Sequence, residues 1–69
     1  MKTRKIDLNL LTIFEAVYET RNQSRAAERL YMTQPSVSVA ISKLRSLVGD
    51  RLFLVGPGGL SPTKKADTL

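Results

Sequence analysis

The sequence of 69 residues contains neither cysteine nor histidine. Without cysteine the chain forms no disulfide, and without either residue it has no zinc site of the Cys/His type. Carboxylates are not clustered either, and the glycine-rich stretch Gly56–Gly59 does not lead into a helix N-terminus as a phosphate-binding loop does. We therefore expect no enzymatic activity, no metal and no cofactor.

Long apolar runs are also missing. No stretch approaches the roughly 20 apolar residues of a transmembrane helix. The beginning MKTRKIDLNLL lacks the uninterrupted apolar core and the small-residue cleavage site of a secretory signal. We therefore expect a cytoplasmic protein with no membrane partner.

Acidic residues are scarce, since 11 Lys/Arg against 6 Asp/Glu give a net charge of +5, and none lies between Glu28 and Asp50. Such a balance indicates a polyanionic partner, most commonly nucleic acid. A basic membrane-surface helix is the rival, but Lys and Arg are spread along the whole chain here. A chain this short buries only about 60% of its unfolded surface, so support is expected from helix packing, a partner subunit or further chain.

The first helix is predicted from about Leu8 to Thr20, with Asp7 as its N-cap. Its apolar stripe is wide, because Leu11 and Tyr18 flank a centre that is already apolar. Either another element packs on this helix, for example from a second subunit, or the helix is simply well buried in a small core. The centre of the stripe consists of Leu10, Ile13, Phe14 and Val17.

Two further helices follow at short spacing. The second is predicted from Ser24 to Leu30, where Ala26 and Ala27 allow two helices to cross at close quarters. A turn of about three residues, Tyr31–Thr33, then leads to a third helix, Gln34–Val48. The third helix has strong end signals: Thr33 caps it, Pro35 falls in its first turn, and Gly49 follows it. Together these segments predict a helix-turn-helix over about residues 23–42.

The third helix has two unlike faces. Its apolar stripe predicts the core side and consists of Val37, Ala40, Ile41, Leu44, Leu47 and Val48. The other face is small, rich in serine and basic only at its edge, which fits close approach to a DNA major groove. The competing interpretation is a helical protein-interaction module without DNA binding. That alternative predicts exposed apolar residues around Ser38 and Ser42, where only Val39 is apolar.

A short hairpin and a last helix complete the chain. The run Arg51–Val55 is rich in β-forming residues, Gly56–Gly59 predicts a turn, and Leu60 with Ser61 can return as a second strand. This hairpin is the wing of a winged helix-turn-helix, or a flap that covers the core. Thr63 can cap a last helix, KKADTL, which we expect to be the beginning of a longer one.

With these segments laid out, the chain resembles the N-terminal DNA-binding domain of LysR-type transcriptional regulators over nearly its whole length. The resemblance is carried by DLNLLTIFEAV, SRAAERLYMTQPSVSVAISKLR, GDRLF and GLSPT. It implies a mainly α fold: residues 1–62 form a winged helix-turn-helix of three helices and a short wing, and residues 63–69 begin a truncated linker helix for dimerisation. It also implies an effector-binding domain that this chain does not contain.

For function, the resemblance implies sequence-specific binding of double-stranded promoter DNA in the nucleoid, with the recognition helix in the major groove. The protein would act as a homodimer, and as a tetramer at full length, and any small-molecule effector would bind the missing domain. Residues 1–5 are expected to be a solvated basic tail rather than a DNA-reading arm. Two departures stand out: Val39 replaces a common arginine, and the wing tip Val55–Gly59 has no Arg or Lys, which argues against minor-groove reading by this wing.

The expected site residues fall into three groups. Those expected to read bases are Gln34, Pro35, Ser36, Ser38, Val39 and Ser42. Those expected to contact phosphates are Ser24, Arg25, Thr33, Lys43, Arg45, Arg51, Lys64 and Lys65. Those expected at the dimer interface are Leu11, Tyr18 and Leu69.

Overall fold

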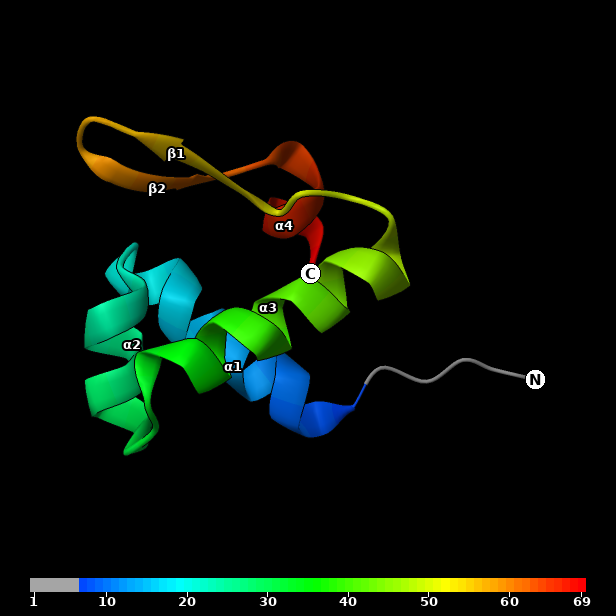
Figure 1. The fold of residues 1–69 in the computed structure, drawn as a ribbon. Coiled ribbons are helices and arrows are strands. Elements are labelled where there is room, and N and C mark those ends of the chain that lie inside the picture. Colours follow the sequence, from blue (N-terminus) through cyan, green and yellow to red (C-terminus); the bar gives the residue numbers. More distant parts are fainter. Residues whose placement is uncertain (1–6) are drawn as a thin grey trace.

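The computed structural model describes residues 7–69, so the expectation of a basic tail at residues 1–5 lies outside the described residues. The described chain forms four helices and one two-stranded antiparallel sheet (Figure 1). The elements are α1 (Leu8–Thr20), α2 (Gln23–Leu30), α3 (Gln34–Val48), β1 (Phe53–Gly56), β2 (Gly59–Pro62) and α4 (Lys64–Thr68). This arrangement confirms the predicted fold of three helices, a hairpin wing and a last short helix.

The predicted caps explain where most helices begin. Oδ1 of Asp7 accepts a hydrogen bond from the backbone N–H of Asn9 at 2.8 Å, and Oγ1 of Thr63 accepts one from Ala66 at 3.1 Å. At the far end of α3, Gly49 adopts a left-handed conformation with φ of 69° and donates its N–H to the carbonyl of Arg45. These local contacts satisfy backbone groups that a helix end otherwise leaves without a partner.

The second helix begins one residue earlier than predicted. Asn22 is its N-cap, since Oδ1 of Asn22 accepts a hydrogen bond from the N–H of Arg25 at 3.0 Å. Asparagine caps helices well, and from this position it starts the helix at Gln23. Ser24 therefore lies within α2, and its hydroxyl is free for another contact.

The first strand begins at Phe53, and not at Arg51 as predicted. Leu52 interrupts the extended conformation, because its φ is 67° and its side chain is fully buried. The hairpin pairs Leu54 with Ser61 and Val55 with Leu60, and it closes at Gly56 and Gly59. The N–H of Leu60 donates to the carbonyl of Arg21, which joins the wing to the end of α1.

A single apolar core lies between the helices and the hairpin. Its largest fully buried side chains are Phe53, Ile41, Leu44, Leu52, Val17 and Val37. The ring centroids of Phe14 and Phe53 lie 5.4 Å apart, so α1 and β1 pack directly on each other. The prediction that Leu47 belongs to the core is wrong, since its side chain is 55% exposed. Leu47 lies at the edge of the stripe centred on Ile41 and Leu44, beyond the reach of the elements that cover them.

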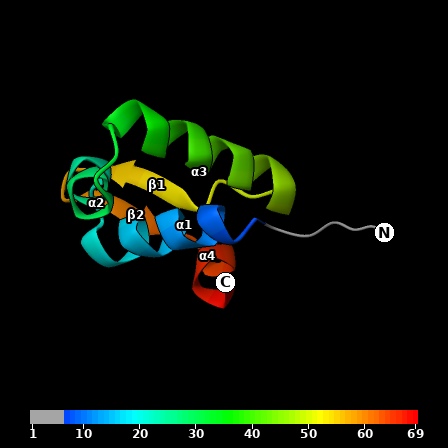
Figure 2. The ribbon, with the colours of Figure 1, turned by 90° about the horizontal axis from the view of Figure 1, so that it is seen from below.

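Within residues 7–69, no helix combines the length and the apolar character that crossing a membrane requires. In the view of Figure 2, helix α3 runs along one edge of the molecule, α4 lies at the opposite edge, and α1 lies between them. Any surface formed by α3 is therefore separate from any surface formed by α4.

Candidate nucleic-acid interface

The outer face of α3 is an exposed, largely uncharged surface. All six residues predicted to read bases are exposed there: Gln34, Pro35, Ser36, Ser38, Val39 and Ser42. Val39 is the apolar member of this set and is 56% exposed. The opposite side of the helix is held in the core by Val37, Ile41 and Leu44. The fold thus fixes which face of α3 is available, and small side chains on that face let the backbone approach a partner closely.

The N-terminus of α3 is ordered by Thr33. Its Oγ1 accepts a hydrogen bond from the N–H of Ser36 at 3.3 Å and donates one to Oγ of Ser36 at 2.9 Å. Pro35 occupies the first turn, where its missing N–H leaves no gap in the helix. Thr33 therefore sets the start of α3, and with it the position of Gln34 as the first helical residue.

Helix α2 contributes to the same surface. Ser24 and Arg25 are both exposed in its first turn. Oγ of Ser24 donates a hydrogen bond to Oε1 of Gln34 at 2.8 Å, which joins α2 to the first residue of α3. The sequence alone did not reveal this pair, because it depends on how the two helices cross.

Basic side chains lie at the edge of the α3 surface. Lys43 is exposed and forms no ion pair within the described chain, where the ion pair found joins Arg29 to Glu19. Arg45 is half-buried, and its Nε donates to the carbonyl of Arg51 at 2.8 Å, so part of its guanidinium already serves the fold. Arg51 itself is exposed after the end of α3. Lys43 and Arg51 are consequently the freer cations near this helix.

The remaining predicted phosphate contacts, Lys64 and Lys65, are exposed on α4. The structure does not bring them together with the outer face of α3, because α4 lies at the opposite edge of the molecule (Figure 2). The wing tip is exposed and apolar, with Val55 at 87% exposure. Neither region adds a cation to the α3 surface.

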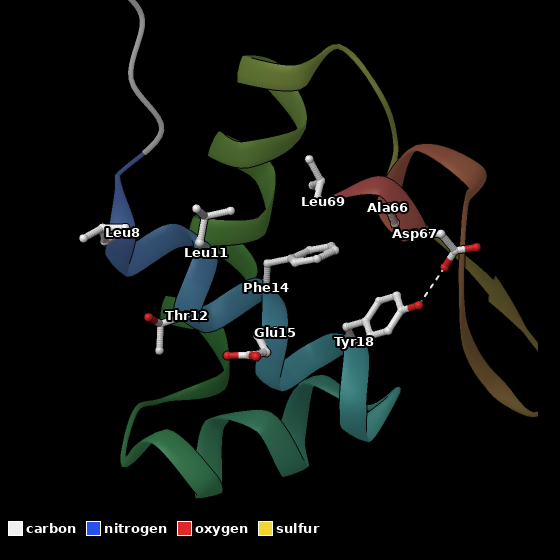
Figure 3. A pocket seen from close by; sticks show the side chains of 9 residues that line it. All are labelled: Leu8, Leu11, Thr12, Phe14, Glu15, Tyr18, Ala66, Asp67 and Leu69. Carbon is white, nitrogen blue, oxygen red and sulfur yellow. Dashed lines mark hydrogen bonds between the residues drawn. The ribbon is translucent and has the colours of Figure 1, made fainter.

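The residues predicted for dimerisation lie together in another place. Leu11, Tyr18 and Leu69 line one groove of about 380 Å³ between α1 and α4 (Figure 3). The hydroxyl of Tyr18 donates a hydrogen bond to Oδ1 of Asp67 at 2.8 Å across this groove. That bond, followed by burial and the negative charge of Asp67, raises the pKa of the Tyr18 phenol above its ordinary value. Leu8, 78% exposed, and Leu69, 45% exposed, leave the groove with an uncovered apolar rim.

Asp50 has a structural role that the sequence did not indicate. Oδ2 of Asp50 accepts hydrogen bonds from the N–H of Leu52 at 2.8 Å and from Oγ1 of Thr63 at 2.6 Å. The hydroxyl of Thr63, and then the backbone N–H of Leu52, hold the pKa of this carboxyl below its ordinary value. Asp50 thereby links the end of α3 to both ends of the wing.

Comparison with known proteins agrees with this geometry. Residues 8–67 match the family model described as "Bacterial regulatory helix-turn-helix protein, lysR family". The chain is 46% identical over 63 residues to the HTH-type transcriptional regulator LeuO of Escherichia coli (strain K12), covering 91% of this chain and 20% of LeuO. The chain thus spans about a fifth of the length of the curated relatives it matches.

Solved structures are similar over the same region. A probable transcriptional regulator, PA0477 from Pseudomonas aeruginosa, superposes with a TM-score of 0.87 at 40% identity, covering 91% of this chain and 21% of that one. The CbnR_DBD-DNA complex superposes with a TM-score of 0.84 at 27% identity, covering 90% of this chain and 71% of that one. With its family model matched over nearly the whole helical and wing region, the chain belongs to the lysR family of bacterial regulatory helix-turn-helix proteins.

Proposed function

We propose that this chain binds double-stranded DNA in a sequence-specific manner, as the DNA-binding part of a transcriptional regulator. The observation that carries the proposal is the outer face of α3, where six small or polar residues are exposed together and no acidic residue interrupts them. Lys43 lies on the same helix as a cation free to meet a phosphate. The similar fold of the CbnR_DBD-DNA complex supports this reading of the surface.

In the proposed complex α3 enters the major groove with its N-terminal half. Gln34 can bond to an adenine edge, and Val39 can contact a thymine methyl. Thr33, Lys43 and Arg51 would contact the phosphates on either side, with Arg25 of α2 near them. The competing role as a protein-interaction module is less well supported, because Val39 is the one exposed apolar residue around Ser38 and Ser42.

We further propose that two copies of the chain bind together, each through its α1–α4 groove. The groove presents Leu8, Leu11 and Leu69 around Tyr18, and such an apolar surface is stabilised when a second subunit covers it. Because α3 lies at the opposite edge of the molecule (Figure 2), pairing through the groove leaves both recognition helices free. The DNA site would then contain two half-sites related by a dyad.

The experiment that tests this function is a selection of bound sequences from a random duplex library at moderate salt. We expect recovery of a motif with two dyad-related halves, whose spacing reports the distance between the two α3 helices. Recovery of a single half-site would support base reading and contradict pairing. Weak, salt-sensitive binding to every duplex without any motif would overturn the proposal of sequence-specific binding.

A further inference from the structure

Ser24 and Gln34 lie ten residues apart in the sequence and meet where α2 crosses the start of α3. The hydroxyl of Ser24 donates to Oε1 of Gln34 at 2.8 Å. Both side chains are exposed, so the contact lies on the surface of the domain and not in its core. From the sequence we expected Ser24 to contact a phosphate. In the structure the hydroxyl of Ser24 points instead to Gln34, the side chain that we expect to read a base.

The chemistry of the glutamine amide gives this bond a consequence. The amide carries an oxygen that only accepts hydrogen bonds and an NH₂ group that only donates them, and a half-turn of the terminal bond exchanges the two. With Oε1 bonded to Ser24, that exchange breaks the bond. It also requires the Ser24 hydroxyl to turn and accept from Nε2, which takes one of the two amide hydrogens away from a ligand. The two hydrogens on Nε2 of Gln34 form no hydrogen bond with any of residues 7–69 and are available to a ligand.

We propose that Ser24 is a positioning residue for base reading: it fixes the amide of Gln34 so that Nε2 is presented to an acceptor on a base edge. This inference rests on the proposed DNA binding. A purine N7 is such an acceptor. Oε1 keeps a second lone pair, so it can also accept from the N6 amino group of adenine while it remains bonded to Ser24. Adenine is therefore the base that this arrangement favours.

The bond matters little to the free domain and more to the complex. In the free domain both groups are exposed, and each would otherwise form hydrogen bonds to water. Loss of the Ser24–Gln34 bond therefore barely changes the stability of the fold. In the groove water is excluded, and an amide that has already been oriented loses less freedom on binding. Removing the hydroxyl of Ser24 lets the amide present its oxygen to the base as readily as its NH₂, which weakens discrimination at one base pair by about threefold to tenfold.

The test is a double-mutant cycle on the 69-residue domain with its selected site. Wild type, Ser24→Ala, Gln34→Ala and the double variant are titrated with that duplex and with duplexes changed at each single base pair. We expect Ser24→Ala to lower discrimination at the base pair that Gln34→Ala also affects, and to add nothing once Gln34 is alanine. Ser24→Thr keeps a hydroxyl and restores discrimination, and the Tm of Ser24→Ala stays close to that of wild type.

A different result separates this inference from the proposed function. If Ser24→Ala weakens binding to all duplexes equally and adds in full to Gln34→Ala, Ser24 contacts a phosphate, and the positioning role is overturned while DNA reading stands. If the wild-type domain discriminates at no base pair, sequence-specific binding itself fails. If Gln34→Ala alone relaxes a base pair and Ser24→Ala does not, Gln34 reads its base without help from Ser24, which also overturns the inference.

Discussion

Tyr31 occupies a backbone conformation that an L-residue adopts at a cost. It ends α2 with φ of 57° and ψ of 42°, and its side chain is 97% exposed, so the ring contributes almost no packing in return. Glycine, common in turns of this kind, takes the left-handed conformation without a clash of its side chain. Tyr31 adopts this conformation because the turn between α2 and α3 needs a left-handed residue at the end of α2.

We expect Tyr31→Gly to raise the free energy of unfolding by about 0.5–1 kcal/mol, because it removes left-handed strain and gives up little burial. Urea denaturation of the variant and wild type measures the difference. Tyr31→Ala is the matched control, since it removes the ring but keeps Cβ, and it should bring no such gain. A glycine variant less stable than the alanine variant would contradict this explanation.

Asp50 makes the stability of the domain depend on pH. Its folded-state pKa is lowered by the hydrogen bonds from Thr63 and Leu52, so it lies below the pKa in the unfolded chain. The stabilisation is therefore complete above about pH 4 and is lost as the pH falls through the folded-state pKa. We expect Asp50→Ala to lower the Tm at pH 7, and the gap from wild type to narrow as the pH falls below about 4.

Thermal unfolding at a series of pH values measures this gap. Glu28→Ala controls for the removal of one negative charge, because Glu28 is exposed and forms no side-chain hydrogen bond with the rest of residues 7–69. If the difference in Tm between Asp50→Ala and wild type stays constant into the acid range, the charge of the carboxylate does not contribute to the stability of the domain.

At the scale of the element, local signals in the sequence predicted helix bounds well. The bounds of α1 and α3 are confirmed because each has its cap beside it in the chain, as with Asp7 and Thr33. The start of α2 was predicted one residue too late, at Ser24, because the cap formed by Asn22 starts the helix at Gln23. The strand was misplaced because the left-handed conformation of Leu52 depends on tertiary packing.

Contacts between elements could not be predicted from the sequence. Ser24 meets Gln34, and Asp50 meets Thr63, across separations of 10 and 13 residues. Such pairs depend on the angle and depth at which two elements pack, which the hydrophobic pattern does not determine. The exposed face of α3 could be predicted because helical period alone decides it, whereas the way that face is held and extended by α2 could not.

Two residues of α3 should affect DNA binding in different ways. We expect Gln34→Ala to cost about 1–3 kcal/mol on the selected site and to relax one base pair, because a base contact is lost. We expect Lys43→Ala to weaken binding to all duplexes and to reduce the slope of log K against log salt by about 1, because a phosphate contact is lost. Titrations at several salt concentrations measure both effects. Equal loss on selected and random DNA for Gln34→Ala would contradict its assignment as a base reader.

At the scale of the whole molecule, two surfaces lie at opposite edges. The α3 surface and the α1–α4 groove share no residue, and α3 and α4 lie on opposite sides of α1 in the view of Figure 2. A change in the groove should therefore leave the contact of one subunit with one half-site intact. The arrangement allows pairing and base reading to be tested apart.

Leu11→Asp provides that test. Leu11 is half-buried in the groove and lies outside the group of fully enclosed core residues, so a charge there opposes the approach of a second subunit while the fold is retained. We expect the variant to lose tight binding to a duplex with two half-sites and to bind a single half-site as wild type does, measured by titration with both duplexes. The Tm of the variant establishes that it is folded at the assay temperature.

Because two linked contacts bind far more tightly than one, the affinity of Leu11→Asp for the duplex with two half-sites should fall by more than tenfold, or about 1.4 kcal/mol. An unchanged affinity for the double site would place the pairing surface elsewhere than between α1 and α4.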